Sequence, residues 1–240
     1  MMLLPGVWQV GGPSKSHFFD ATVYLLPCGD DLFLIDCGTR EGHAQIVENI
    51  RSAGFDPKKI TRIWATHGHY DHVGGAGMFW EESGAKLYLH PADRRQVEAG
   101  DSLKTTASLL YGVEAEPLAV DGDIREGDEF TVDAGTVSVL HTPGHSPGSC
   151  CFVLRHRNGT VTLFAGDTLH GGCHPDIGSD IAVWRESLKK LTDRHFDYFT
   201  FGHMNPHLLC DADERIRCLA QSFGNYFMPW FKDFYRHYSY

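Results

Sequence analysis

The segment at residues 66–72 reads THGHYDH and constrains the fold more than any other part of this 240-residue chain. Three histidines and an aspartate stand within six residues, and on a strand or a helix their side chains would point in different directions. A tight loop at the end of a strand lets them converge on a cation, and the apolar residues at 60–64 predict such a strand. The expected ligands are His67 and His69 for one metal, and Asp71 and His72 for a second.

Three further ligand candidates follow predicted strands elsewhere in the chain. The segments HTPGHSPGS, LFAGDT and FTFGH come after or at the end of the apolar runs at 136–140, 160–164 and 197–201. Each candidate alone is weak, but strand ends are rigid places that fix the geometry of a ligand, and all three share that position. These candidates are His145, Asp167 and His203.

The alternation of the remaining segments predicts two β-rich halves with helices around them. Apolar runs at 22–26 and 32–36 flank a turn, and runs at 150–154 and 160–164 flank Asn158-Gly159, a strong hairpin signal. A strand is expected at 85–90, a helix within 42–55, and a second helix over 181–191 with Ser179 or Asp180 as its N-cap. Two such halves favour two sheets that pack together with helices outside.

The ordered set THGHYDH, TPGH, GDT and FGH, preceded by LIDCG at 34–38, resembles the metallo-beta-lactamase superfamily over roughly residues 20–205. The resemblance implies an α/β (α+β) fold, a four-layer αββα sandwich with the metal site at one edge of the two sheets. It also implies a role for each motif residue. His67, His69 and His145 would hold the first metal; Asp71, His72 and His203 the second; Asp167 would bridge them, and Asp36 would support the metal loop.

Five imidazoles and two carboxylates suit two zinc ions, with iron and manganese as alternatives. Two metals that bridge a hydroxide give a nucleophile for cleaving an ester, a thioester or a lactone. In this interpretation Asp71 also orients the nucleophile or moves a proton. We therefore predict a dinuclear zinc metallohydrolase that acts on a small-molecule substrate.

The segment GDTLHGG, followed by a helix that ends in SLKKL, looks most similar to the glyoxalase II branch, which hydrolyses thioesters of glutathione. Lactonase relatives often carry a tyrosine where this chain has His170, which makes His170 a second catalytic candidate, as a hydrogen-bond or proton donor. Lactonases and phosphodiesterases of the same fold remain alternatives. Iron-dependent persulfide dioxygenases, which are oxidoreductases, share much of the motif and form another.

Charge and cysteine content narrow the partners and the compartment. The formal net charge of -10 disfavours binding to phosphate backbones, so no nucleic-acid partner is expected. There is no apolar run of about 18 residues and no basic segment at the start, so neither a membrane span nor a signal peptide is expected. Seven cysteines without a C-x-x-C pair are typical of free thiols, which together predicts a cytoplasmic protein.

A single domain over residues 1–240 is expected, with two unusual segments. Residues 91–118 form an insertion between predicted strands that could cap the site. Residues 211–240 form a predicted helical tail that is rich in aromatic side chains. Packing of an aromatic stripe on the sandwich, a homodimer interface and a wall of the substrate pocket are the alternatives for this tail.

Overall fold

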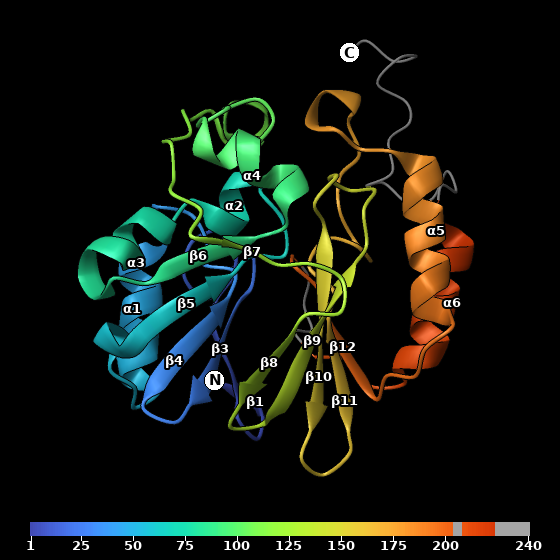
Figure 1. The fold of residues 1–240 in the computed structure, drawn as a ribbon, viewed down its shortest axis with the longest axis horizontal. Helices are drawn as coiled ribbons and strands as arrows, with labels where there is room; N and C mark the ends of the chain where they lie inside the picture. The colour runs from blue at the N-terminus through green and yellow to red at the C-terminus, as the bar shows by residue number, and fades with distance from the viewer. Residues whose placement is uncertain (204–207, 224–240) are drawn as a thin grey trace.

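The computed structural model describes residues 1–203 and 208–223, and Figure 1 shows their arrangement. Within these residues the backbone forms a seven-stranded sheet and a five-stranded sheet, with helices on the outer face of each. The predicted four-layer αββα sandwich is therefore confirmed.

The first sheet has the strand order β1-β2-β3-β4-β5-β6-β7. Its first four strands pair antiparallel, whereas β4, β5, β6 and β7 pair parallel, so the carboxyl ends of these last strands lie at one edge. The strands are β1 (Met2–Leu4), β2 (Val7–Gly11), β3 (Val23–Cys28), β4 (Asp31–Ile35), β5 (Ile60–Trp64), β6 (Lys86–Leu89) and β7 (Gly122–Asp123). The helices in this half are α1 (His43–Ser52), α2 (Tyr70–Val73), α3 (Ala76–Ser83) and α4 (Pro91–Glu98), with shorter helical turns at Pro57–Lys59 and Ala107–Tyr111.

The second sheet has the order β12-β11-β10-β9-β8 and is antiparallel except for the pair β11 and β12. Its strands are β8 (Glu129–Val132), β9 (Gly135–His141), β10 (Cys150–His156), β11 (Val161–Phe164) and β12 (Tyr198–Thr200). Two helices cover it, α5 (Ile181–Thr192) and α6 (Ala212–Ser222), and a short turn spans Pro175–Ile177.

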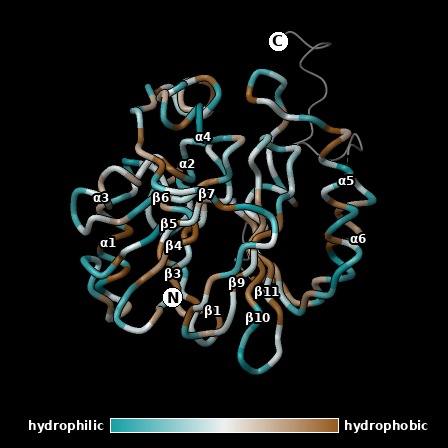
Figure 2. Tube along the Cα trace, in the orientation of Figure 1, coloured by the Kyte–Doolittle hydropathy of each residue, from teal (hydrophilic) through white to brown (hydrophobic). Residues whose placement is uncertain are grey.

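Three apolar layers hold the sandwich together, and β10 shows how one strand serves two of them. Successive side chains of a strand point to opposite faces. Phe152 and Leu154 therefore pack between the sheets, while Cys151 and Val153 face the side of α5 and α6. Figure 2 shows apolar residues concentrated along the strands and on parts of the covering helices.

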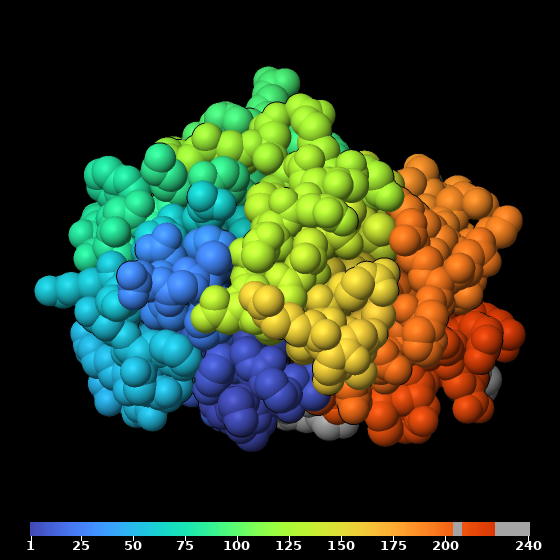
Figure 3. Space-filling model, turned by 60° about the horizontal axis from the view of Figure 1, so that its bottom comes forward, coloured from blue at the N-terminus to red at the C-terminus, as the bar shows by residue number. Residues whose placement is uncertain are grey.

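The two ends of the sandwich differ. At one end β10 and β11 are joined by the predicted Asn158-Gly159 turn, where Gly159 adopts a φ of 90° that a side chain would strain. Figure 3 shows this end, where the N-terminal residues (dark blue) lie beside the hairpin (yellow). Because β10 starts and β11 ends at the opposite edge, the residues that precede β10 and follow β11 gather there.

Several elements match the sequence predictions closely, and others were not predicted. Asp180 is the N-cap of α5, where its carboxylate accepts hydrogen bonds from the amides of Ala182 and Val183. Strands β1, β2, β7 and β8 were missed, because they are short or carry a weak alternation. The predicted helix at 42–55 is shorter, since Gly54 turns the chain with a φ of 90°.

The C-terminal tail is described only in part. Helix α6 packs against the second sheet, and the ring of Phe223 lies 5.2 Å from that of Trp184 on α5. Residues 224–240, which carry most of the predicted aromatic segment, lie outside the described residues. Among the helices of the described part of the chain, none combines the length and apolar character that crossing a bilayer requires.

Candidate metal centre

The predicted ligands meet at the edge where strands of both sheets end. The loop after β5 carries His67 and His69, and the short helix α2 that follows carries Asp71 and His72. The second sheet supplies the others from separate connections. His145 precedes β10, Asp167 follows β11 and His203 follows β12. The structure therefore brings together all seven predicted ligands, in three groups that could each hold a metal ion.

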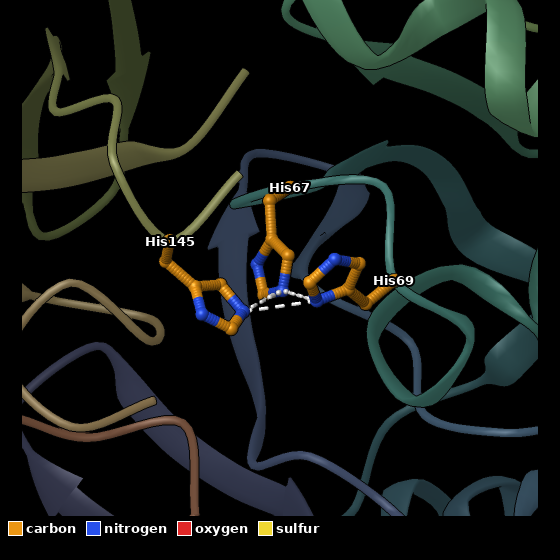
Figure 4. A group of neighbouring side chains, drawn as sticks. All are labelled: His67, His69 and His145. Carbon is orange, nitrogen blue, oxygen red and sulfur yellow. Dashed lines mark hydrogen bonds between the residues drawn. The ribbon is translucent and has the colours of Figure 1, made fainter. Parts of the chain in front are cut away.

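Three histidines form the first group, and Figure 4 shows their rings turned toward one another. His67 Nε2 lies 2.9 Å from His69 Nδ1, and His145 Nε2 lies 3.2 Å and 2.9 Å from these two atoms. One proton cannot serve all three contacts of such a triangle with good geometry. Ring nitrogens bound at about 2.0–2.1 Å to one tetrahedral zinc ion would lie about 3.3 Å apart, close to this spacing.

The second group joins the first half of the chain to its end. His203 Nε2 lies 2.9 Å from a carboxylate oxygen of Asp71, and His72 Nε2 lies 3.4 Å from the same oxygen. The ring nitrogens of His72 and His203 that face each other are 3.4 Å apart. These three donors thus surround a position beside the three-histidine group.

Asp167 lies between the two groups. One of its oxygens is 3.4 Å from His145 Nε2 of the first group and 3.4 Å from His203 Nε2 of the second. The other, Oδ1, is 3.4 Å from His72 Nε2 and, among the described residues, has no hydrogen-bond partner although it is buried. A buried carboxylate oxygen without a hydrogen bond is costly unless a cation lies beside it, which here is either a protonated His72 or a bound metal ion. The buried Oδ1 of Asp167, which has no hydrogen bond among the described residues, is the observation that supports a metal pair at this site.

Hydrogen bonds at the rear of the rings fix which nitrogens face the centre. Asp36 follows β4 with a φ of 57°, and its carboxylate accepts from the Thr66 amide at 2.7 Å and the Thr66 hydroxyl at 2.9 Å. The same carboxylate lies 2.8 Å from His72 Nδ1, which leaves Nε2 for the centre. His145 Nδ1 donates to the carbonyl oxygen of Gly172 at 2.8 Å. Such partners orient metal ligands and choose their tautomers.

Burial and charge divide the histidines into two kinds. Burial lowers the pKa of His67 and His69 well below the ordinary value and also lowers the pKa of His145. These rings are therefore neutral at neutral pH and present lone pairs, as metal ligation requires.

The second group behaves oppositely. Burial alone would lower the pKa of His203, but the carboxylates of Asp167 and Asp71 raise it to about 10. Burial is also outweighed at His72, where Asp71 and Asp36 raise the pKa well above its usual range. Burial opposes ionisation of Asp71, yet His72 and His203 bring its pKa down to about 2. In the metal-free protein, protons on the two histidines thus offset the buried carboxylates.

His170, the second catalytic candidate, lies next to this centre but is not among its ligand groups. It is buried, 8% exposed, with its ring 5.9 Å from that of Phe201. Burial lowers its pKa, with Asp167 acting in the opposite direction. The structure thus places a buried imidazole of lowered pKa beside Asp167.

Sequence reasoning missed two side chains near the centre, and both come from the 91–118 segment. The ring of Tyr111 lies 5.7 Å from that of Tyr70, the neighbour of Asp71 in the chain, and burial together with the carboxylates of Asp71 and Asp167 raises the pKa of its phenol. Asp93 on α4 is fully buried and bonds to both metal-binding loops. Neither residue belongs to a local motif. Predicting them would have required knowing how α4 and the loop after it pack against the THGHYDH loop.

A two-sheet sandwich with buried histidines and aspartates at its strand ends has the donors of a metal-binding protein. The sequence model of the metallo-beta-lactamase superfamily matches residues 18–203. The chain belongs to the metallo-beta-lactamase superfamily.

Individual proteins and solved structures are also similar to this chain. An uncharacterized protein of Aquifex aeolicus is 38% identical over 60% of this chain and 72% of its own length. An atrochrysone carboxyl ACP thioesterase of Passalora fulva is 27% identical over 84% of this chain. That alignment covers 54% of the thioesterase, so the chain spans about half the length of this relative. A subclass B3 metallo-beta-lactamase of Bradyrhizobium japonicum, 22% identical, shares the fold with a TM-score of 0.77 over 93% of this chain and 89% of its own.

Metal binding is expected to release protons. Because His203 has a pKa of about 10 without metal, and that of His72 is also raised, both rings carry a proton at pH 7 that a metal must displace. Metal affinity should therefore rise with pH, and titration of the metal-free protein at pH 7 should release about two protons. Calorimetry in buffers of different ionisation enthalpy measures this number. His203→Ala should lower it by about one, and a heat that is the same in every buffer would contradict the assignment.

Proposed function

We propose that the protein is a dinuclear zinc hydrolase that cleaves thioesters of apolar acyl groups. The observation that carries the dinuclear assignment is Asp167, whose oxygens approach histidines of both ligand groups at 3.4 Å. The donor set of imidazoles and carboxylates suits zinc, with iron and manganese as the alternatives. The thioester preference is supported by relatives named as acyl carrier protein thioesterases and by the resemblance to glyoxalase II.

The residues of the chain divide the work. His67, His69 and His145 would hold one metal ion; Asp71, His72 and His203 a second; and Asp167 both. When bound, the metal pair lowers the pKa of a water molecule and polarises the carbonyl of the substrate. Asp71 is ionised in this site and accepts or orients a proton of the attacking water.

His170 serves the leaving group in this proposal. Its lowered pKa keeps the ring neutral at pH 7, so it acts as an N–H hydrogen-bond donor rather than as a cationic acid. A thiolate leaves without prior protonation more easily than an alkoxide or an amine does, because its conjugate acid has a lower pKa. Hydrogen-bond donation is therefore sufficient assistance for a thioester.

We infer an apolar rim from exposed side chains on two loops that meet at Phe19 and Tyr111, and this rim supports an acyl substrate. We define the rim as Phe18, Leu109 and Leu110, whose exposed fractions are 78%, 41% and 62%. The ring of Phe19, next to Phe18, lies 5.1 Å from that of Tyr111, so the two loops that carry the rim touch each other close to Asp71. Exposed apolar side chains gathered near a polar site are typical of a binding surface.

The first test concerns metal content and reaction. The purified protein should contain close to two zinc ions per chain, release thiol from acyl thioesters and lose activity on chelation. Asp167→Ala should lower occupancy of both metal positions and activity by about 100-fold or more. Asp197→Ala is the matched control, because Asp197 accepts the Val161 amide at the other end of β11. One iron ion per chain, unchanged by Asp167→Ala, would instead indicate an oxidoreductase.

The second test concerns His170. His170→Ala should reduce kcat/KM for thioesters at least tenfold, about 1.4 kcal/mol of transition-state stabilisation, while elemental analysis finds the same metal content. His174→Ala in the same loop is the control, since the His174 side chain accepts the Asp176 amide and is not a predicted ligand. Equal activity of the two variants would assign His170 to packing alone.

The third test concerns the rim. Phe18→Ser and Leu110→Ser should each reduce kcat/KM about fivefold for a long-chain acyl thioester, because each removes about 1 kcal/mol of apolar contact. Hydrolysis of the acetyl thioester should not change. Trp80→Ser is the control, because Trp80 is 61% exposed on α3 and lies outside the rim. A loss of kcat/KM that is the same for short and long acyl groups would contradict a role of the rim in substrate binding.

A further inference from the structure

Asp93 has a bonding pattern that packing alone does not explain. This α4 residue is completely buried, yet its carboxylate makes hydrogen bonds to two loops that lie far apart in the sequence. One oxygen accepts from the Gly68 amide at 2.9 Å and the Ser146 hydroxyl at 2.6 Å. The other accepts from the Gly148 amide at 2.7 Å.

The two loops are those of the three-histidine group. Gly68 separates His67 from His69, and Ser146 directly follows His145. The first loop leaves the seven-stranded sheet and the second leads into the five-stranded sheet, so Asp93 connects the ligand loops of both layers. Besides Asp93, the contacts of His145 with His67 and His69 join these loops, and the Cys150 amide at the start of β10 donates to the Thr66 carbonyl at 2.7 Å.

Both glycines show that the approach to Asp93 is close. A Cβ atom on Gly148 would lie 2.6 Å from Asp93 Cγ, and one on Gly68 would lie 3.0 Å from Asp93 Cβ. The φ of neither glycine is in the positive region, so their conformations do not require glycine. A side chain at position 148 would therefore press on the Asp93 carboxylate, and one at position 68 would meet Val97 Cγ2 at 2.9 Å as well as Asp93 Cβ.

Asp36 offers a comparison within the same site. Its carboxylate bonds to Thr66 and to His72 Nδ1, so it orients a ligand of the second group directly. Asp93 touches none of the seven ligand side chains in the hydrogen bonds of the described residues, and holds instead the backbone and the hydroxyl next to three of them. Asp36 reaches the first group only through Thr66, whose hydroxyl lies 3.1 Å from His67 Nδ1, whereas the hydrogen bonds of Asp93 all go to the two loops of the three-histidine group.

We propose that Asp93 is the positioning residue of the three-histidine metal site, fixing the distance between the His67–His69 loop and the His145 loop. The inference rests on the metal centre and not on the thioester substrate. Removing the charge of Asp93 leaves at least one of the three hydrogen-bond donors without an acceptor. One loop is then no longer held to the other. Affinity for the first metal then falls while the second group, held by Asp36, keeps its geometry.

The test measures zinc affinity one site at a time, by competition with a chromophoric chelator. His203→Ala weakens the second group, so the affinity of the three-histidine site can be measured. His145→Ala weakens the three-histidine site, so the affinity of the second group can be measured. Asp93→Asn should lower zinc affinity at least tenfold in the His203→Ala background and less than threefold in the His145→Ala background. Ser146→Ala, which removes one of the three hydrogen bonds, should shift affinity in the same direction by a smaller factor.

Asp20→Asn is the matched control for a buried carboxylate. Asp20 is completely buried and accepts the Thr39 amide at 2.8 Å and hydroxyl at 2.6 Å, but bonds to neither metal loop. Asp20→Asn should lower the midpoint of thermal unfolding, and its effect on zinc affinity should be the same in the two backgrounds. Equal losses of affinity for Asp93→Asn in both backgrounds, or no loss in either, would overturn the proposal. Absence of zinc binding in the wild-type protein would contradict the metal centre and this inference with it. Normal zinc binding without hydrolysis of thioesters would contradict only the proposed substrate.

Discussion

Five imidazoles and two carboxylates, enclosed at the edge of the sandwich within hydrogen-bond distance of one another, are the constraint on which the rest of the structure depends. Such groups cost free energy when they leave water, and cations or protons must balance the carboxylates. The raised pKa of His203 shows protons in that role when no metal is bound. The surrounding fold can be understood as the set of supports that keeps these groups from moving apart or relaxing toward solvent.

Those supports come from rigid elements rather than from the ligand loops themselves. The ligands follow or precede strands whose register is set by the two sheets, and the sheets are held by a shared apolar layer that includes Trp64 and Phe152. Behind His145, the ring of Trp184 packs at 5.3 Å, and its indole nitrogen donates to the Thr168 carbonyl. Apolar packing and polar orientation thus meet at the same residues, so the geometry of the centre depends on both.

The ligand set and the sandwich could be predicted from the sequence because their signals are local. THGHYDH concentrates four donors in six residues, and the other ligands stand beside recognisable strands and turns. Asp93 and Tyr111 could not be found that way. Their roles depend on how α4 and the loop after it lie against distant segments, and a helical aspartate or a loop tyrosine is common on any surface. The edge strands β1 and β8 were not predicted for a related reason, because three or four residues give little periodicity.

The distribution of ligands along the chain has a consequence for biosynthesis. Each of the three ligand groups combines residues from 67–72 with at least one of His145, Asp167 and His203. While the ribosome is still making the first half, the growing chain therefore holds four donors but no finished group. No group has all its donors before His145 has been synthesised, and the last group is complete only with His203, so the order of translation itself delays full metal binding until most of the chain has been made.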